Sequence, residues 1–276
     1  MIVFKDKKDI QYAPETFSQN VPYRLMGAYG SLDFVDRNIR VLSVQFSKVG
    51  KKTYDAFPNL EWIVARSHGI DNVNLEECEK RGIGIVNTNP YAESTARWIQ
   101  QHLAGDWRIG GSGIHFGTVG FVGYGAIAKN VKVPNKLVFN SKNTKEDLLK
   151  LAVNANTLVI TIPQTKETKG IIGEAVLSVF FGKIISVGRW DIIDNKALLK
   201  NIERITHAYI DTLGETNQQE LLDTGKVTYS KHTAWSTGFS YDEKYFHNLE
   251  SIIKKCLNNT VDNPTLPRKK RRTLWD

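Results

Sequence analysis

Short apolar runs rich in β-branched residues alternate along this chain with segments whose apolar positions recur every three or four residues. The first half contains the runs MIVF (1–4), RVLSVQF (40–46), LEWIVAR (60–66) and IGIVN (83–87). LEECEKRG (75–82) has helical spacing and ends in a helix-closing glycine. Strands that alternate with helices predict a small parallel α/β unit that ends near Asn87.

A second alternating series follows a helix predicted over 94–103 and a glycine-rich loop over 105–117, which we interpret as a join between two parts of the chain. Its apolar runs are TVGFVG (118–123), KLVFN (136–140), NTLVITIP (156–163), KIISVG (183–188), HAYID (207–211) and KVTYS (226–230). Segments with helical spacing, such as 145–152 and 195–202, lie between them. The series predicts a second parallel sheet.

The composition is that of a folded protein, since 41% of the 276 residues are hydrophobic, enough for one large or two ordinary domains. The two cysteines, Cys78 and Cys256, lack metal-ligand spacing, so we expect no disulfide framework and no metal site. No apolar run approaches a membrane span of about 20 residues, and the N-terminus lacks the long apolar core of a secretory signal. We therefore expect a cytoplasmic protein without membrane contact.

The net charge of +8 indicates either nucleic-acid binding or a pocket for anions. Lysines are scattered through most of the chain, and the one dense cluster is PRKKRR (267–272) near the C-terminus. Such a terminal cluster is usually a solvated end, with a targeting or nucleic-acid role as the alternative. The distribution favours an anion pocket, and we expect no nucleic-acid partner.

The second series opens with a glycine fingerprint. Gly123, Gly125 and Ala128 form G-x-G-x-x-A directly after an apolar strand and at the start of a helix. Glycine permits the tight turn and lets backbone amides approach a pyrophosphate. In this strand, turn and helix context the motif predicts NAD(P) binding, with a purely structural glycine turn as the alternative.

The next strand ends without the acidic residue that usually binds the ribose 2′-hydroxyl. Asn140, Ser141 and Lys142 stand in its place. An acid there would repel a 2′-phosphate, whereas a hydroxyl and a lysine can hold one. We therefore expect NADP in preference to NAD.

Several separated motifs keep one order along the chain, namely SHGIDN (67–72), NTNPYAESTARW (87–98), TIPQTKETKGIIGEAVL (161–177), SVGRWDIID (186–194) and KHTAWSTG (231–238). Together they resemble the D-isomer-specific 2-hydroxyacid dehydrogenases. The resemblance implies a two-domain α/β fold and a homodimer. A doubly wound Rossmann nucleotide-binding domain, 93–237, would be inserted into a smaller flavodoxin-like substrate domain made of 1–92 and 238–276.

The resemblance also assigns binding residues. Ser67, His68 and Gly69 would line the substrate site, with the amides of His68 and Gly69 available to a carboxylate; an ordinary turn is the alternative reading of this segment. Pro163 and Thr165 would lie near the phosphates or the nicotinamide of the cofactor.

We interpret KIISVGRWDIID (183–194) as a buried strand with Arg189 inside it. A guanidinium in an apolar strand is costly unless its charge is paired, and its planar fork matches a carboxylate with two parallel hydrogen bonds. The resemblance likewise makes Arg189 the substrate-binding arginine. A structural ion pair with an aspartate or glutamate is the alternative.

Reduction of a ketone needs a hydride from the nicotinamide and a proton donor, usually a histidine. His232 follows a predicted strand, at the sheet edge where ligands bind in open α/β folds, and its motif resembles the family's catalytic histidine motif. The resemblance assigns Glu215 as the carboxylate that would raise the pKa of this imidazole and orient it, and places Asp211 near the nicotinamide.

We therefore expect an enzyme that transfers a hydride between NAD(P) and a small D-2-hydroxy acid or 2-keto acid, such as glyoxylate or hydroxypyruvate. Arg97 stands where the family usually has glutamate, and Trp190 where glycine commonly follows the arginine. One alternative is a cofactor-sensing, corepressor-like protein with little turnover, which the basic tail and Trp190 fit. Another is a family member that acts on formate or phosphite. The set of Arg189, Glu215 and His232 favours an enzyme.

Overall fold

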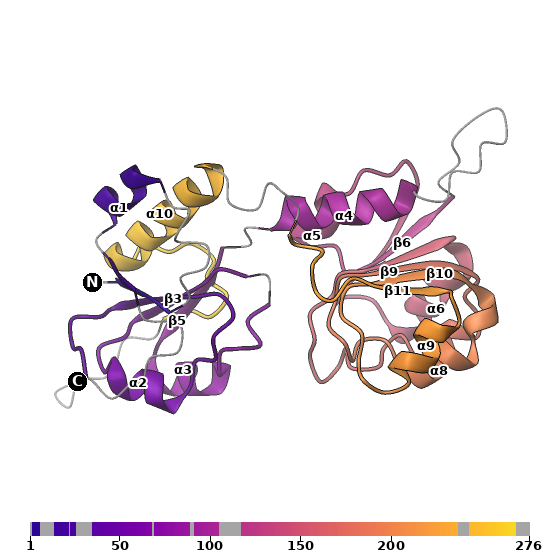
Figure 1. Cartoon of the computed structure of the whole chain (residues 1–276), viewed down its shortest axis with the longest axis horizontal. Helices are drawn as coiled ribbons and strands as arrows, with labels where there is room; N and C mark the ends of the chain where they lie inside the picture. Colours follow the sequence, from indigo (N-terminus) through magenta and orange to yellow (C-terminus); the bar gives the residue numbers. More distant parts are fainter. Residues whose placement is uncertain are drawn as a thin grey trace. The chain divides into compact units, whose positions relative to one another are not determined.

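The computed structural model describes residues 2–5, 14–21, 23–25, 35–67, 69–88, 91–104, 117–236 and 243–268. Contacts along the chain divide it into two compact units (Figure 1). The first unit joins Met1–Tyr91 to Gly238–Asp276, and the second is Ala92–Thr237. Each unit has its own parallel sheet, so the two are described separately.

The first unit contains β1 (Ile2–Phe4), α1 (Glu15–Asn20), β2 (Tyr23–Leu25), β3 (Val41–Val44), α2 (Lys51–Ala56), β4 (Trp62–Ala65), α3 (Leu75–Arg81), β5 (Gly84–Asn87) and α10 (Glu243–Asn258). All strand pairs are parallel, and the order is β2-β1-β3-β4-β5. This is the flavodoxin-like order 2-1-3-4-5. Residues on both faces of β1, β3 and β4 are buried, as a parallel sheet covered on both sides requires.

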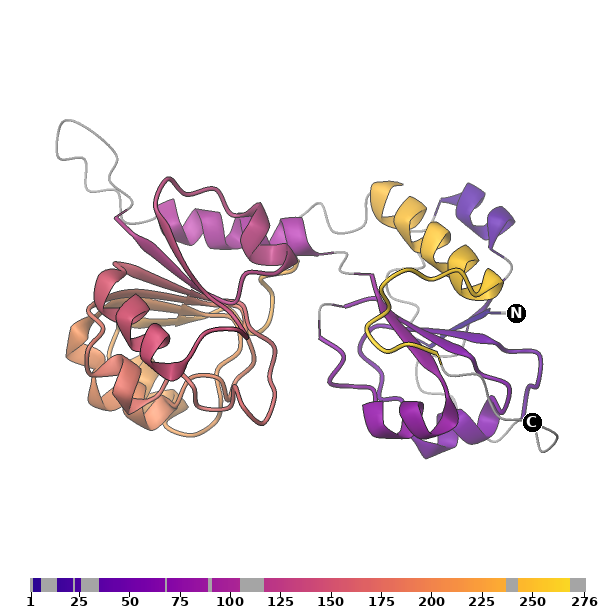
Figure 2. The same ribbon diagram turned by 180° about the vertical axis from the view of Figure 1, so that it is seen from behind.

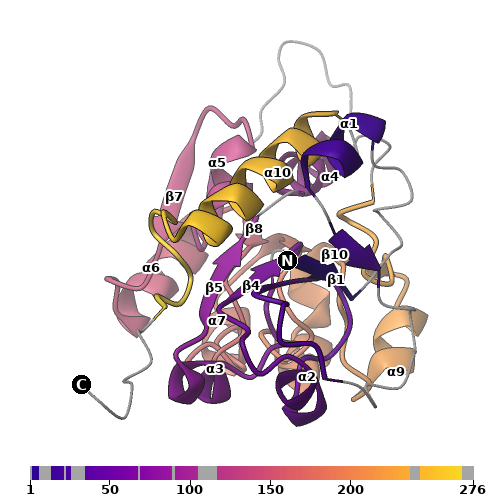
Figure 3. The ribbon, with the colours of Figure 1, turned by 90° about the vertical axis from the view of Figure 1, so that its left-hand side faces the viewer.

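Helices cover both faces of the first sheet (Figure 3). On one face α1 and α10 lie side by side (Figure 2). Their residues Phe17, Phe246 and Ile253 pack against Phe4 and other strand residues. On the other face α2 and α3 pack against the strands. The chain beyond α10 returns to the sheet, where Leu266 forms an antiparallel bridge with Ile85. The two ends of the sequence therefore build one core.

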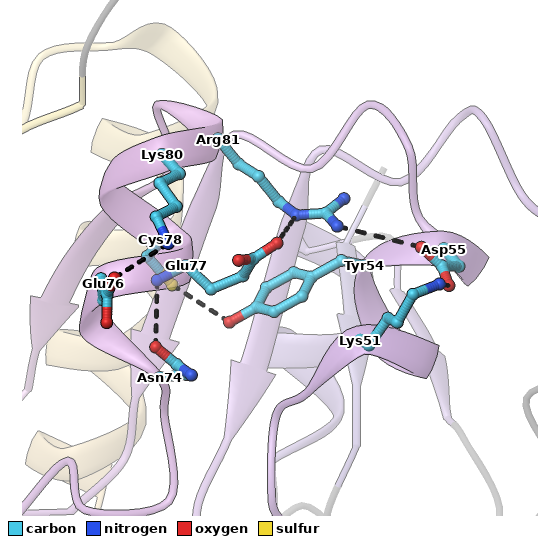
Figure 4. Close-up of polar contacts among 9 residues, drawn as sticks. All are labelled: Lys51, Tyr54, Asp55, Asn74, Glu76, Glu77, Cys78, Lys80 and Arg81. Carbon is cyan, nitrogen blue, oxygen red and sulfur yellow. Dashed lines mark hydrogen bonds and ion pairs between the residues drawn. The ribbon is translucent and has the colours of Figure 1, made fainter.

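A buried contact joins α2 to α3 (Figure 4). The Tyr54 hydroxyl lies 3.2 Å from Cys78 Sγ, and both side chains are buried. Burial is the main cause that raises the pKa of both groups, so both stay protonated at neutral pH. The Arg81 guanidinium lies over the Tyr54 ring, 5.0 Å from its centroid, and pairs with Glu77 at 2.6 Å. These contacts hold two helices together and do not form a reactive centre.

The second unit contains α4 (Ala92–Ala104), β6 (Val119–Val122), α5 (Ala126–Asn130), β7 (Lys136–Phe139), α6 (Lys145–Asn154), β8 (Thr157–Ile160), α7 (Glu174–Leu177), β9 (Gly182–Ser186), α8 (Asn195–Lys200), a 3₁₀ turn (Ile202–Arg204), β10 (Ile205–Ile210), α9 (Gln218–Asp223) and β11 (Val227–Tyr229). Its strands are parallel in the order β11-β10-β9-β8-β6-β7. The chain moves outward from β6 to β7 and then crosses back to β8. This reversal between β6 and β8 is the switch point where doubly wound sheets bind ligands.

Helices also cover both faces of the second sheet. Trp98 and Ile99 of α4 pack with Ala128 of α5 on one face. Leu148 of α6 and Leu198 of α8 belong to the core on the other face. In the common six-stranded order 3-2-1-4-5-6 a further strand lies outside the second one. Among the described residues no strand lies beyond β7, which is therefore an edge strand.

The predicted α/β fold with two parallel sheets is confirmed, including a flavodoxin-like sheet and a doubly wound sheet. Each strand predicted from an apolar run is present. The short strand β2 was not predicted, because its sequence YRL contains no apolar run. None of the described helices is long and apolar enough to cross a membrane.

Candidate active site

The G-x-G-x-x-A motif forms the turn between β6 and α5. Gly123 has φ +93°, and a Cβ there would lie 2.7 Å from Ile162 Cγ2 and 2.9 Å from Ile162 N, so this position needs glycine. A Cβ on Gly125 would meet no atom within 4 Å, so space is open in front of that residue. Ala128 is buried where α5 packs on the sheet. The turn thus has the close packing and the open side that a bound pyrophosphate requires.

The loop after β7 is exposed and held by its own hydrogen bonds. Asn140 Oδ1 accepts from the Lys142 amide at 2.9 Å, and the Asn140 amide donates to Asn143 Oδ1 at 2.8 Å. The side chains of Ser141 and Lys142 are exposed. Within the described part of the chain, Lys142 forms no ion pair. Asn140 therefore shapes the turn, and the side chains of Ser141 and Lys142 are accessible from solvent.

Hydrogen bonds of two threonines, Thr165 and Thr168, hold the loop after β8 in its conformation. The Thr165 amide donates to Thr168 Oγ1 at 2.7 Å, and that hydroxyl donates to the Pro163 carbonyl at 2.7 Å. Gln164 Nε2 donates to Asp191 Oδ2 at 2.8 Å, which ties this loop to the one after β9. Pro163 and Thr165 are both exposed on this fixed loop.

Arg189 lies outside the strand that we predicted around it. β9 ends at Ser186, and Arg189 begins a turn in which the Ile192 amide donates to the Arg189 carbonyl at 3.2 Å. The side chain is half-buried, so its desolvation cost is smaller than in an apolar strand. Trp190 is 53% exposed, and its ring lies against Gly214, where a Cβ would meet Trp190 Cε3 at 3.2 Å.

Asp211 organises the loop that carries His232. It directly follows β10 and is buried, and its Oδ1 accepts hydrogen bonds from Ser230 Oγ at 2.5 Å and from the Ala234 amide at 2.9 Å. The His232 amide donates to the Asp211 carbonyl at 2.6 Å. Lys231 and His232 both have positive φ, 55° and 59°. Non-glycine residues in this region are held there by their surroundings, often at functional sites.

Glu215 and His232 are both exposed, on the loops after β10 and β11. The structure does not pair them. The Glu215 side chain forms no hydrogen bond or ion pair with any other described residue. Glu215 is instead part of the turn before α9, where the Gln218 amide donates to its carbonyl at 3.2 Å.

The predicted substrate residues of the first unit follow β4. Ser67 Oγ donates to the Gly69 carbonyl at 2.6 Å, so this segment is a hydrogen-bonded turn. His68 lies outside the described residues. Arg97 is exposed on α4 and pairs with Glu93 one turn earlier at 2.8 Å, so it has a local partner on the helix surface.

Three positioning residues were not predicted from the sequence. Asp191 and Ser230 join loops through the contacts described above, and Thr212 Oγ1 donates to the Gly188 carbonyl at 2.6 Å. A polar residue directly after a strand was the signal that could have found Ser230, which follows β11. Thr212 is the second residue after β10, behind Asp211, and stands at no such position. Asp191 carries no such signal, because its partner Gln164 lies on another loop.

The loops of the second unit that carry these side chains leave one edge of one sheet, because parallel strands all end on the same side. Arg189, Glu215 and His232 lie on three neighbouring loops there, after β9, β10 and β11. The glycine turn after β6 lies at the same edge. This edge brings together a glycine turn, whose backbone amides can bind phosphates, a guanidinium, which can bind a carboxylate, and an imidazole, which can transfer a proton.

This chain is similar to proteins of known family. Residues 11–202 match the family model for the catalytic domain of D-isomer specific 2-hydroxyacid dehydrogenases. A glyoxylate/hydroxypyruvate reductase of Arabidopsis thaliana is 29% identical over 226 residues, which cover 67% of this chain and 70% of that protein.

Two solved structures have a similar fold. An NAD+-bound 3-phosphoglycerate dehydrogenase of Entamoeba histolytica has a TM-score of 0.76 and 20% identity, with 96% of this chain and 97% of that one covered. An NADPH-dependent glyoxylate/hydroxypyruvate reductase of Sinorhizobium meliloti, in complex with NADP and malonate, has a TM-score of 0.69, 21% identity and 99% coverage of both chains.

Proposed function

The chain belongs to the D-isomer-specific 2-hydroxyacid dehydrogenase family, and from this premise we propose that it is an NADPH-dependent reductase of small 2-keto acids such as glyoxylate or hydroxypyruvate. The family makes it an NAD(P)-dependent oxidoreductase. The matching relatives are named as reductases, which favours turnover over a corepressor-like sensing role.

The residues after β6 and β7 fit a dinucleotide. The open space at Gly125 admits a pyrophosphate to the backbone of the turn. Ser141 and Lys142 would hold a 2′-phosphate, because both are exposed and no acid stands among 140–142 to repel it. When bound, the nicotinamide supplies the hydride.

The chain's own residues supply substrate binding and the proton. Arg189 would grip the substrate carboxylate with its planar fork. His232 would hold the proton and give it to the carbonyl oxygen at C2, which becomes the alcohol. Glu215 would orient and support the imidazole once substrate is bound, since catalytic hydrogen bonds often form only in the complex. Ser67, His68 and Gly69 would complete the carboxylate site.

The observation that carries the proposal is the anchoring of the His232 loop by the buried Asp211. A carboxylate that is buried and bonded on both sides of a residue with positive φ fixes that residue's main chain. A surface histidine without a catalytic role does not need a fixed main chain. A proton donor does need a fixed position, because it must lie within hydrogen-bond distance of the reacting oxygen.

Initial rates with glyoxylate, hydroxypyruvate and pyruvate, each with NADPH and with NADH, test the proposal. We expect at least one of the three acids to oxidise NADPH. The loss of absorbance of the reduced nicotinamide measures this reaction. Formate and phosphite, assayed with NADP+ and NAD+, are the controls for the other family chemistries. Cofactor binding without turnover of any acid would refute the reductase. A preference for NADH would refute only the proposed binding of a 2′-phosphate by Lys142, and the reductase activity would stand.

A homodimer and a cytoplasmic location are further proposals, supported by the family resemblance. Sedimentation equilibrium of the full chain, with and without NADPH, measures the first. We expect the mass of a dimer, and a monomer at micromolar concentration would refute it.

A further inference from the structure

A shallow pocket of about 360 Å³ lies on the second unit, between the end of α5 and the start of β7. Lys129, Lys132 and Lys136 line it, together with Tyr124, two valines and Pro134. No acidic residue contributes to its described walls. This part of the surface is open because α5 is short and β7 is an edge strand. The pocket therefore has three positively charged side chains around it.

The hollow is held in shape by contacts from three directions. Lys136 Nζ donates to the Tyr124 hydroxyl at 2.6 Å and lies 5.0 Å from the centroid of the Tyr124 ring. Gln100 of α4 bonds both backbone groups of Lys132, with its Nε2 donating to the carbonyl at 3.0 Å and its Oε1 accepting from the amide at 2.9 Å. The Val131 amide donates to the Ala128 carbonyl at 3.1 Å. The pocket is therefore preorganised.

The lysines of the pocket differ from other lysines of the same unit. Lys150, Lys200 and Lys226 each pair with a glutamate, at 3.1, 2.8 and 2.9 Å. Lys129 and Lys132 form no ion pair with any residue that the structure describes. Lys136 has a neutral hydroxyl as its partner. Like charges around one hollow repel, and a bound anion removes that repulsion.

We propose that this pocket binds a small anion that carries two or more phosphate groups. A single carboxylate balances only one of the three charges, whereas a diphosphate balances most of them and accepts hydrogen bonds from several ammonium groups. The pocket is separate from the loop proposed for the 2′-phosphate. Lys136 is the first residue of β7, next to Val119, and Asn140 follows its last residue.

Isothermal titration calorimetry of the full chain with inorganic pyrophosphate tests this proposal. We expect binding that weakens as salt is raised, because surface charges are screened. The triple variant K129Q/K132Q/K136Q should bind at least about tenfold more weakly. The matched variant K145Q/K150Q/K196Q removes the same charge from α6 and α8 and should change the affinity less than about twofold. K129Q/K132Q keeps the contact between Tyr124 and Lys136, so it tests the pocket if the triple variant unfolds.

Three results would overturn the proposal. One is no binding of pyrophosphate to the unaltered protein. Another is an equal loss in both triple variants, which would indicate diffuse attraction by net charge. The third is displacement of pyrophosphate by saturating NADP+, or loss of binding in K142Q, since either result would assign the pyrophosphate to the cofactor site. None of these measurements uses the reductase assay, so failure of the proposed reaction would leave the outcome unaffected.

Discussion

Asp211 fixes the main chain of His232 from inside the protein. The His232 amide donates to the Asp211 carbonyl at 2.6 Å, while the Asp211 carboxylate bonds Ser230 and Ala234 on either side of the histidine. The exposed imidazole therefore stands on a loop whose anchor is buried. Mutation of either residue should affect catalysis, but only mutation of Asp211 should also affect stability.

Asp211→Ala should lower the free energy of unfolding by about 1–3 kcal/mol, because two donors lose their acceptor inside the protein. Turnover should fall as well, since the His232 loop is released. Urea denaturation and steady-state kinetics measure the two effects. Ser230→Ala removes one donor together with its bond and should cost about 1 kcal/mol or less. Wild-type stability and turnover in Asp211→Ala would contradict the anchoring role.

Arg189→Ala should lower kcat/KM for glyoxylate by about 10- to 100-fold, which corresponds to the loss of hydrogen bonds between charged groups. Arg189→Lys should recover little, because an ammonium cannot form the two parallel bonds of a guanidinium. Binding of NADPH, measured by fluorescence titration, should be unchanged in both. Arg204→Ala is the control, since Arg204 precedes β10 at the opposite edge of the sheet. Unchanged kinetics in Arg189→Ala would exclude Arg189 from the substrate site.

His232→Gln should reduce kcat by about 100-fold or more, the usual contribution of a general acid. Cofactor affinity and the free energy of unfolding should change little, because the side chain is exposed. His207→Gln is the matched control: His207 lies within β10, where its Nε2 is 2.8 Å from Thr228 Oγ1. If the two variants lose equal activity, His232 is not the proton donor.

Lys142→Gln should raise KM for NADPH by about tenfold and leave KM for NADH nearly unchanged, because only NADPH carries the 2′-phosphate. Initial rates with both cofactors and one keto acid give the two values. Lys145→Gln, on the exposed first turn of α6, should leave both unchanged. A parallel rise for NADH and NADPH would mean that Lys142 contacts a part common to both cofactors.

Cys256 should make the protein less stable in alkali. Burial raises the pKa of its thiol to about 12, whereas an unfolded cysteine titrates near 8.5. Above about pH 8.5 the unfolded chain releases a proton that the folded chain keeps, so stability falls as pH rises towards the folded pKa. Between pH 8 and pH 10 this group should cost about 2 kcal/mol.

Urea denaturation of wild type and Cys256→Ala at pH 8 and pH 10 isolates this effect. The variant should be less stable at both pH values, because a buried side chain is shortened. It should, however, lose less stability between them than wild type does. Tyr54 and Cys78 also have raised pKa values and contribute equally in both proteins. An identical pH dependence would show that the Cys256 thiol is not protected.

The fold was predictable because buried parallel strands are apolar on both faces and stand out as runs, as in β4 and β8. The sequence order of such runs also predicted two sheets. The short strand β2 was not predictable, since its pairing with β1 comes from the tertiary structure. The pocket beside α5 was not predictable, because it depends on where Lys136 and Tyr124 come together.

The position of Arg189 shows where sequence reasoning failed. Val187 and Gly188 continue the apolar run, so the strand was expected to extend through the arginine, yet it ends at Ser186. The chain leaves the sheet there because the loops at this edge bond to each other, for example Thr212 to the Gly188 carbonyl. Glu215 was chosen by resemblance, which could not tell whether its side chain contacts His232. Such contacts depend on loop conformations that no local pattern encodes.

The first unit draws its core from both ends of the chain, and this affects the order in which the protein can fold during synthesis. Phe246, Leu249 and Ile253 of α10 fill one face of a sheet whose strands are all made from the first ninety residues. Domains usually fold as units, N-terminal first. Here the second unit leaves the ribosome complete, while one face of the sheet of β1 to β5 is covered by α1 without α10 until that helix is made. The N-terminal half of this chain is therefore the last part to become a finished domain.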